Sequence, residues 1–229
     1  MSTLYRLLLI EDDPREASAI EQSCCPDPSK GAIDVVGNSA DAEEALESNE
    51  YDVILCDLAL PADGRQVDPD TAEGMRLIQL MGEQSRGTPV IIISAHADLH
   101  MATNFLDASR VGDLYGTQVD EPLVRFFPKE DLPDCIEAVR AHIAKTETLD
   151  AFVLTSQGVD LSLSEERALK IYGRRQGAAS AMVEPFDAGL SAAKTLKVSL
   201  IEPDGADAGC VVAKLGLSVS APSSATRHS

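Results

Sequence analysis

Acidic residues follow directly after two apolar runs of this sequence, at the places where buried strands would end. The stretch LLLIEDDP runs from apolar residues into Glu11 and Asp12, and YDVILCDLALP runs into Asp57. Two further runs, PVIIISAH and VRFFPKEDL, reach Ser94 and Lys129. Carboxylates bind hard cations, and a carboxylate beside an ammonium group can accept a phosphoryl group. These residue types therefore indicate cation binding and phosphoryl transfer, provided that the fold brings them together.

Short apolar runs alternate with segments of helical spacing along the first two thirds of the chain. The apolar runs have the length of buried parallel strands, and they cover residues 7–10, 33–36, 53–56, 90–93 and 124–127. The helical segments cover residues 15–24, 40–48, 71–84, 98–109 and 132–146. A strand followed by a helix, five times over, predicts a doubly wound α/β domain over residues 1–148.

The functional crevice of an open parallel sheet lies beyond the carboxyl ends of its strands. The acids, Ser94 and Lys129 are therefore expected on one rim, although they are far apart in sequence. Carboxylates at close quarters raise one another's pKa unless a cation lies among them, and an all-oxygen site suits Mg²⁺. We expect Asp57 to act as the nucleophile toward a phosphoryl group, with Lys129 neutralising charge on the transferred oxygens. The hydroxyl of Ser94 would then donate to a phosphoryl oxygen.

The four stretches quoted above resemble, in order, the signature segments of the receiver domain of two-component response regulators. The resemblance implies a flavodoxin-like fold with a five-stranded parallel sheet in the order 2-1-3-4-5. It also implies Mg²⁺ as cofactor, a histidine kinase or phosphotransfer protein as phosphodonor, a downstream protein target, and a homodimer as one open alternative. Beyond phosphorylation and dephosphorylation of the chain itself, no enzyme activity is expected.

The resemblance also implies a role for individual residues. Asp57 is the phosphoacceptor, Lys129 the catalytic lysine and Ser94 the switch hydroxyl. The metal ligands are Glu11, Asp12, Asp57 and the main-chain carbonyl of Ala59, and the switch aromatic is Phe126. Alternation alone does not decide whether Phe126 or its neighbour Phe127 faces the switch side of the sheet.

Two departures from the family pattern concern loops, and one residue near the site has a simpler explanation. The stretch ALPADGRQVDPDT after Asp57 is about ten residues longer than the family needs, and VGDLYGTQVDEP lengthens the segment between Ser94 and Lys129. The longer second segment borders the surface that receivers use for dimerisation and output. Asp13 lies outside the matched acid pair and is interpreted as a turn or helix cap.

Charge and composition limit the partners of the chain. The net charge is −19, and residues 1–149 carry 18 of these negative charges, with 29 Asp and Glu against 11 Lys and Arg. Such acidity argues against nucleic-acid binding, which depends on Lys and Arg at phosphates. No apolar run approaches the ~20 residues of a membrane span, and no secretory leader opens the chain, so we expect a cytoplasmic protein without membrane contact. Five cysteines without a C-x-x-C pair predict neither a zinc site nor a disulfide framework.

Residues 149–217 predict a smaller α+β segment. Helical spacing at 164–175, with Ser162 or Ser164 as cap, precedes strand-like alternation at 179–184, 194–201 and 210–215, and an antiparallel meander is expected. The meander faintly resembles the N-terminal lobe of kinase-like phosphotransferases, with Lys214 in the place of the nucleotide-binding lysine, although an ordinary hairpin lysine is favoured. The small, polar residues 218–229 predict a disordered tail.

Three functions of different classes remain open. The first is a phosphorylation switch that accepts a phosphoryl group on Asp57 and changes a protein-interaction surface. The second is an adaptor that keeps the receiver fold as a scaffold and works without phosphate. The third is an enzyme whose activity lies in residues 150–229, where the sequence favours a protein-interaction or vestigial output module. The presence of every site residue with the right chemistry favours the first.

Overall fold

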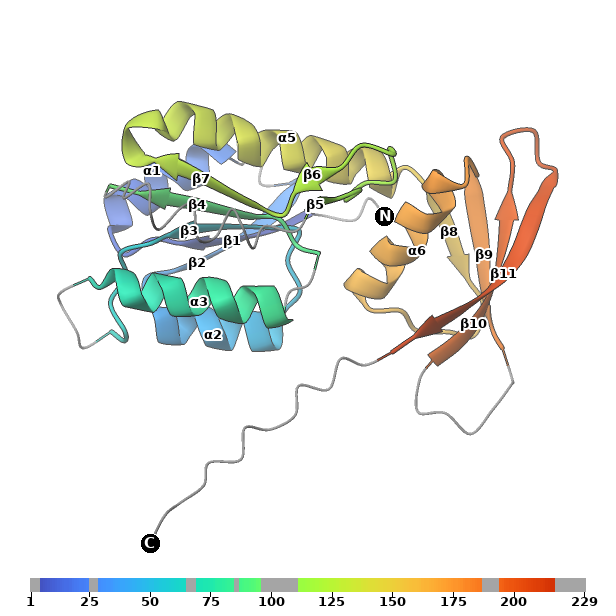
Figure 1. The fold of residues 1–229 in the computed structure, drawn as a ribbon, viewed down its shortest axis with the longest axis horizontal. Helices are drawn as coiled ribbons and strands as arrows, with labels where there is room; N and C mark the ends of the chain where they lie inside the picture. The colour runs from blue at the N-terminus through green and yellow to red at the C-terminus, as the bar shows by residue number, and fades with distance from the viewer. Residues whose placement is uncertain are drawn as a thin grey trace, which may run out of the picture.

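The computed structural model describes residues 5–24, 29–64, 69–84, 87–95, 111–186 and 194–216. Figure 1 shows two units, each built on its own sheet, joined where helix α5 (Leu132–Asp150) runs from the first unit toward the second. The predicted helix at 98–109 and the predicted tail at 218–229 lie outside the described residues.

The first unit is built on a five-stranded parallel sheet with the order β2-β1-β3-β4-β7. Its strands are β1 (Tyr5–Ile10), β2 (Gly31–Val36), β3 (Val53–Asp57), β4 (Val90–Ser94) and β7 (Val124–Pro128). Strands β3 and β4 are buried along their whole length, as expected of central strands covered on both faces. This arrangement confirms the predicted doubly wound fold and its strand order.

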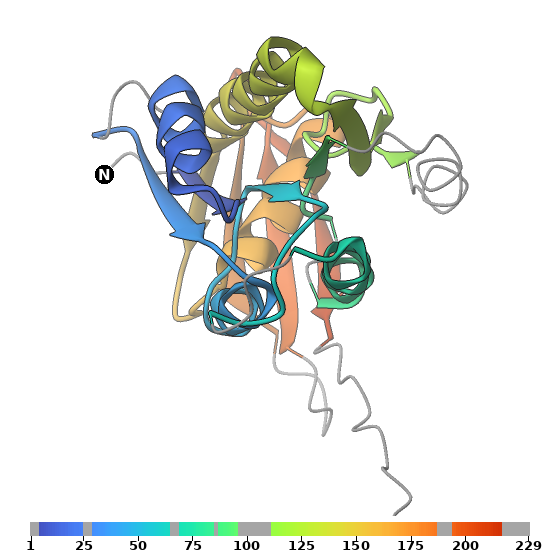
Figure 2. The same ribbon diagram turned by 90° about the vertical axis from the view of Figure 1, so that its left-hand side faces the viewer.

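Helices cover both faces of this sheet, as Figures 1 and 2 show from two sides. Helices α1 (Pro14–Cys24) and α5 bury their apolar side chains in one core cluster with β1, β3 and β4. Helices α2 (Ser39–Ser48) and α3 (Thr71–Gln84) do so in a second cluster on the opposite face. The sheet is therefore held rigidly between two apolar layers, which fixes the positions of its strand ends.

The longer segment before β7 forms a small hairpin, with strands β5 (Val111–Gly112) and β6 (Glu121–Pro122). The carboxylate of Asp113 accepts backbone N–H bonds from Tyr115, Thr117 and Gln118, which closes the turn. The Tyr115 side chain is buried, and its hydroxyl lies 2.6 Å from Nδ1 of His142 on α5. The insertion is thus a folded element anchored on α5.

The second unit has a four-stranded sheet with the order β11-β10-β9-β8 and one covering helix. Its elements are β8 (Val153–Ser156), α6 (Leu163–Arg175), β9 (Ser180–Pro185), β10 (Lys194–Ile201) and β11 (Asp207–Leu215). Ser162, one of the two caps that the sequence left open, caps α6 through a capping box with Glu165. Apolar side chains of α6 and of one sheet face form the core of this unit.

The predicted antiparallel meander after α6 is confirmed, but the sequence did not predict a further strand, β8, before that helix. Strands β9, β10 and β11 are antiparallel, but β8 precedes α6 and pairs in parallel with β9, so that β8, α6 and β9 form a βαβ unit. Strand β8 is short, and Val153, Thr155 and Ser156 are exposed. The sequence missed this strand because it lacks the alternation that a half-buried strand shows.

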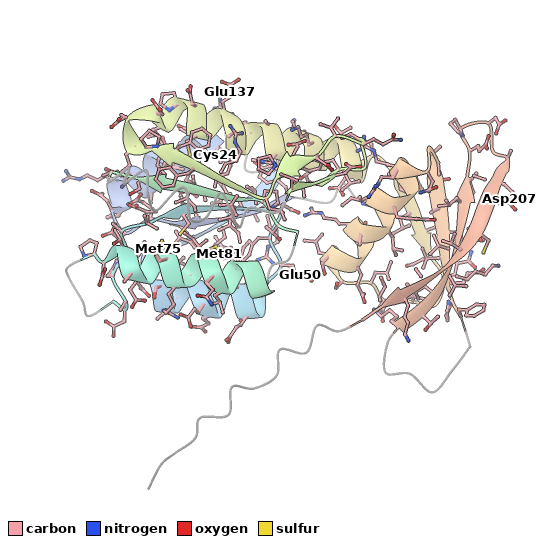
Figure 3. The ribbon with its side chains drawn as sticks, in the orientation of Figure 1. Cys24, Glu50, Met75, Met81, Glu137 and Asp207 are labelled. Atoms are coloured by element: carbon pink, nitrogen blue, oxygen red, sulfur yellow. The ribbon has the colours of Figure 1, made fainter. Side chains whose placement is uncertain are left out.

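The two units are joined by polar contacts to the first two turns of α6. Glu50, labelled in Figure 3, accepts hydrogen bonds from the backbone N–H and the hydroxyl of Ser164, at 3.0 and 2.7 Å. The buried Asp52 accepts the backbone N–H of Arg6 at 2.6 Å and forms an ion pair with Arg167. A cavity of about 920 Å³ lies beside these contacts, between the two units.

The β5–β6 hairpin also contacts α6. Asp113 lies 3.6 Å from Nε of Arg175, and a Cβ added to Gly116 would lie 2.7 Å from the Ile171 carbonyl oxygen. The hairpin therefore approaches the backbone of α6 closely. Among the helices of the described residues, none is long and apolar enough to cross a bilayer.

Candidate functional site

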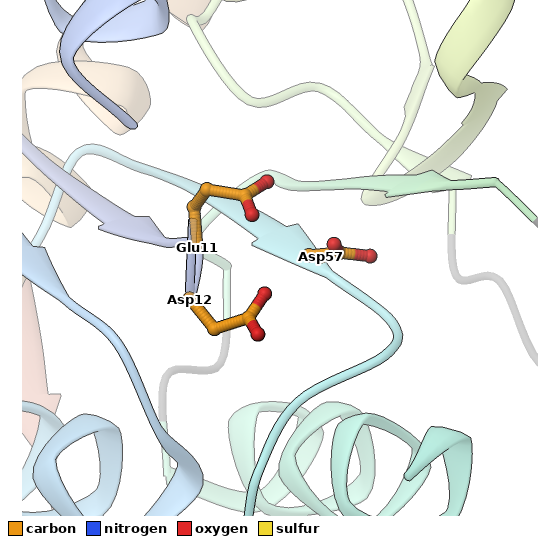
Figure 4. Close-up of side chains that lie close together, drawn as sticks. All are labelled: Glu11, Asp12 and Asp57. Carbon is orange, nitrogen blue, oxygen red and sulfur yellow. The ribbon is translucent and has the colours of Figure 1, made fainter. Parts of the chain in front are cut away.

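Three carboxylates gather at the carboxyl ends of neighbouring strands. Glu11 and Asp12 follow β1 directly, and Asp57 is the last residue of β3, which pairs with β1. One carboxylate oxygen from each residue lies within 4.8 Å of the others, and Figure 4 shows the three side chains turned toward a common space. The structure therefore brings together the three acids that the sequence singled out.

Lys129, which directly follows β7, reaches into this acidic group. Its Nζ lies 2.8 Å from Oδ2 of Asp57, 3.3 Å from Oε2 of Glu11 and 2.7 Å from Oε2 of Glu16. Partial burial alone would lower the pKa of Lys129, but its hydrogen bonds to Asp57 and Glu16 outweigh that effect and raise it. Lys129 is therefore a fixed positive charge beside Asp57.

Among the three clustered acids Glu11, Asp12 and Asp57, Glu11 has the smallest exposed fraction. Loss of solvation raises its pKa to about 7, the backbone N–H of Asp13 opposes this rise, and the charge of Asp57 adds to it. The Asp13 N–H donates to Oε1 of Glu11 at 3.1 Å. A carboxylate with a raised pKa in an acidic site is one whose charged form would be favoured by a bound cation.

Asp57 is held by the backbone that follows it. Its Oδ1 accepts the N–H of Ala59 at 3.1 Å, and only 3% of the Asp57 residue surface is exposed. The residue between them, Leu58, lies against α3 at Gly74, where an added Cβ would be 2.1 Å from the Leu58 carbonyl oxygen. The close approach of α3 therefore fixes the turn that carries Asp57 and Ala59.

Ser94 lies on the same rim, at the end of β4. It is fully buried, and its strand partner in β7 is Pro128, the residue before Lys129. The structure also separates the two phenylalanines of β7. Phe126 packs against the core cluster of α2 and α3, whereas Phe127 packs against that of α1 and α5. Phe126 thus faces away from α1 and α5, and Phe127 faces toward them. The alternation in the sequence had left open which phenylalanine lies on which face of the sheet.

Two acids near the site act as local caps, and one acid was not anticipated. Oδ1 of Asp13 accepts the N–H of Arg15 at 2.7 Å, in agreement with its interpretation as a helix cap. Oδ1 of Asp70, at the end of the long loop, accepts the N–H of Ala72 at 2.8 Å before α3 begins. Glu16 was missed because an acid in the first turn of a helix normally needs no other explanation than the helix dipole.

One comparison with known proteins finds a family model that matches most of the first unit. Residues 7–114, slightly less than half of the chain, match the response regulator receiver domain. This match confirms the resemblance carried by the first three sequence segments. The fourth segment, with Phe126 and Lys129, lies beyond the matched residues. Its position beside β4 in the sheet comes from the pairing of β7 with β4. No curated protein matches the chain.

Several solved structures align with the chain at low identity. The receiver domain of the Francisella response regulator 1452 is 22% identical, with a TM-score of 0.45, and the alignment covers 62% of this chain and 98% of that one. A CheY-like receiver domain protein from Methanospirillum hungatei JF-1 is 17% identical, with a TM-score of 0.44 and coverages of 63% and 99%. The phosphorylated cyanobacterial phytochrome response regulator RcpA is 18% identical, with a TM-score of 0.42 and coverages of 61% and 91%.

Proposed function

We propose that this chain, whose residues 7–114 match the receiver-domain family, is a two-component response regulator that accepts a phosphoryl group on Asp57. The observation that carries the proposal is the ion pair between Nζ of Lys129 and Oδ2 of Asp57, inside a group of acids at the strand ends. A histidine kinase or a phosphotransfer protein would be the donor. The transfer would depend on Mg²⁺.

The donor set fits Mg²⁺. Three carboxylates lie within 4.8 Å of one another, and the ammonium group of Lys129 is the one cation that pairs with them within the described residues. Such an excess of negative charge on oxygen ligands suits a hard divalent cation that also keeps waters and a phosphate oxygen. Glu11, Asp12, Asp57 and the carbonyl of Ala59 would hold the ion. When bound, Mg²⁺ would neutralise charge on the oxygens of the transferred group.

The residues of the chain would divide the remaining tasks. The Asp57 carboxylate attacks phosphorus in line, a new O–P bond forms, and the bond from phosphorus to the donor's leaving atom breaks. Lys129, already beside Asp57, stabilises the negative charge on the transferred oxygens. Ser94 then donates its hydroxyl to a phosphoryl oxygen. We propose no other enzyme activity for the chain, and we propose that it works in the cytoplasm without nucleic-acid or membrane partners.

The added charge would switch a protein-interaction surface. In the proposed switch, Ser94 and Phe126 respond to the phosphoryl group, and both flank the segment that contains the β5–β6 hairpin. Because this hairpin contacts α6, the second unit is in direct contact with the segment between the two switch residues. The output would be a downstream protein target, a homodimer or both.

The intact mass of the protein after incubation with Mg²⁺ and acetyl phosphate tests the proposal. We expect a gain of one phosphoryl group in the parent, and no gain in Asp57→Asn or in the parent with excess EDTA. Asp13→Asn is the matched control, because Asp13 caps α1 and lies outside the three clustered acids. It should be phosphorylated like the parent.

A phosphate-independent adaptor is the alternative. A parent protein that keeps its circular dichroism spectrum and saturates with Mg²⁺, yet gains no mass, would replace the switch with this adaptor. The kinase-like interpretation of residues 150–229 has no support from Lys214, which is exposed on the edge strand β11 opposite Thr195. A nucleotide-binding titration would test it, and we expect no binding.

A further inference from the structure

The acid Glu16 lies outside the three clustered carboxylates, yet it makes the shortest contact of Lys129. Its Oε2 is 2.7 Å from Nζ of Lys129, against 2.8 Å for Asp57 and 3.3 Å for Glu11. Nearly half of the Glu16 side chain is exposed, whereas the side chain of Asp57 is almost wholly buried. Lys129 is therefore held between an inner carboxylate and an outer carboxylate.

The local structure explains why Glu16 reaches this position. Asp13 caps α1, so the helix begins immediately beyond the acids that follow β1. Glu16 lies in the first turn of that helix and contacts Lys129, the residue that directly follows β7. The charge of the ammonium group is consequently shared between the buried proposed phosphoacceptor and a carboxylate that is nearly half exposed.

We propose that Glu16 is a positioning residue that limits phosphoryl transfer to Asp57, because it holds Lys129 at the rim and places a negative charge where an anionic phosphodonor must enter. This inference rests on the proposed function. A negative charge at the entrance repels an approaching phosphodonor, and a lysine shared with Glu16 gives less of its charge to the transferred oxygens. The residue therefore slows both the arrival of the phosphoryl group and its stabilisation on Asp57.

The helix-dipole role of Glu16 is the competing explanation, and it predicts a different result. An acid in the first turn of a helix stabilises the helix, so its loss would lower the melting temperature but would not alter transfer rates in a way that depends on donor charge. The control variant is Glu21→Gln. Glu21 is an exposed acid on the same helix, and it is not among the acids that pair with Lys129 within the described residues, which are Glu11, Glu16 and Asp57.

The experiment measures the rate of phosphorylation by two small donors at saturating Mg²⁺. Glu16→Gln removes the charge and keeps a hydrogen-bond acceptor. With acetyl phosphate, a dianion, we expect it to react about two- to fivefold faster than the parent. This range corresponds to the loss of one exposed charge–charge interaction. With phosphoramidate, which carries less charge, the gain should be smaller. It should also shrink as ionic strength rises from about 0.05 to about 0.5 M, because salt screens the repulsion.

One further variant and one further readout separate the positioning of Lys129 from the charge of Glu16. Glu16→Asp keeps the charge but shortens the side chain, so Lys129 should be released while the repulsion of the donor persists. Reaction of Lys129 with acetic anhydride, followed by peptide mass spectrometry, reports on this release without any phosphorylation. We expect faster acetylation of Lys129 in both Glu16 variants than in the parent and in Glu21→Gln.

The outcomes distinguish the two proposals. If the parent takes up no phosphoryl group, the proposed function fails and the role of Glu16 fails with it. If the parent is phosphorylated and Glu16→Gln matches Glu21→Gln with both donors, only the role of Glu16 is overturned. The role is overturned equally if Lys129 is acetylated at the parent rate in both Glu16 variants.

Discussion

At the scale of single residues, the site combines an excess of negative charge with one fixed cation. Glu11, Asp12 and Asp57 lie close enough to repel one another, and Lys129 forms ion pairs with two of them, Glu11 and Asp57. A bound cation of suitable size should reduce this repulsion between the three carboxylates in the folded protein.

Mg²⁺ should therefore stabilise the protein. We expect the melting temperature to rise with Mg²⁺ concentration in the parent, because an ion that binds only the folded state stabilises it by mass action. Asp12→Asn removes one proposed ligand and should weaken this dependence strongly, whereas Asp13→Asn should keep it. Differential scanning fluorimetry between 0 and about 20 mM Mg²⁺ measures the effect. An equal rise in both variants would exclude Asp12 as a ligand.

A second residue-scale prediction concerns His142, which is buried on α5 against Tyr115. Loss of solvation lowers its pKa to about 4, from the ordinary value of 6.5; the nearby Glu121 acts in the opposite direction, and Lys145 adds to the lowering. Between these two pKa values the unfolded chain binds a proton that the folded chain does not. Stability should therefore fall as the pH drops from about 6.5 to about 4, and this group should have no effect above that range.

The size of the effect of His142 on the free energy of unfolding follows from its pKa shift. A difference of about 2.5 pKa units corresponds to about 3 kcal/mol, lost in full below pH 4. Urea unfolding at several pH values measures it, with His142→Gln as the comparison, because glutamine cannot be protonated and can still accept from the Tyr115 hydroxyl. The stability difference between parent and variant should change by this amount across the range. A constant difference would contradict the burial of an uncharged His142.

At the scale of elements, the packing of α3 against the turn after β3 fixes the position of Asp57. A Cβ at Gly74 would lie 2.1 Å from the Leu58 carbonyl oxygen, whereas one at Gly82, two turns later on the same helix, would meet nothing within 4 Å. The two glycines have the same helix propensity, so they form a matched pair.

Gly74→Ala should be destabilising and Gly82→Ala stabilising. We expect the first to cost about 2–4 kcal/mol, because the backbone of α3 or of the turn must shift to accommodate the methyl group. The second should gain about 0.5–1 kcal/mol from the higher helix propensity of alanine. Urea denaturation measures both, and the phosphorylation rate of Gly74→Ala reports on the turn that carries Asp57. Equal effects of the two substitutions would show that α3 does not position this turn.

Gly74 also illustrates what the sequence could and could not predict. Glu11, Asp12, Asp57, Ser94 and Lys129 were predictable, because parallel strands place the residues after their carboxyl ends on one edge. The strand order followed from the family resemblance. Gly74 and Glu16 were not predictable, because a close backbone approach and a contact between α1 and the end of β7 depend on the packing of separate elements. Strand β8 was missed for a related reason, since its exposed residues carry no periodic pattern.

At the scale of the whole molecule, the contact between the two units depends on charges removed from water. Asp52 is almost fully buried between the N–H of Arg6 and the guanidinium of Arg167. Loss of solvation lowers the pKa of Arg167 to about 10, although the charge of Glu50 opposes this effect. Nε and Nη2 of Arg167 are buried, and neither makes a hydrogen bond within the described residues. The ion pair with Asp52 and the charge of Glu50 therefore both compensate for burying this cation.

A double-mutant cycle tests this contact. Asp52→Asn and Arg167→Met should each cost about 3 kcal/mol, because either change leaves one buried charge without its partner. The double variant should cost clearly less than the sum, by about 1–3 kcal/mol, because the second substitution removes the charge that the first had left unpaired. Lys197→Met, which removes an exposed ion pair with Glu184 on the far sheet, should change stability by less than about 1 kcal/mol. Urea unfolding of the four proteins gives the coupling. Strictly additive costs would show that the two charges act independently and that the units are held by other contacts, such as those of Glu50 with Ser164.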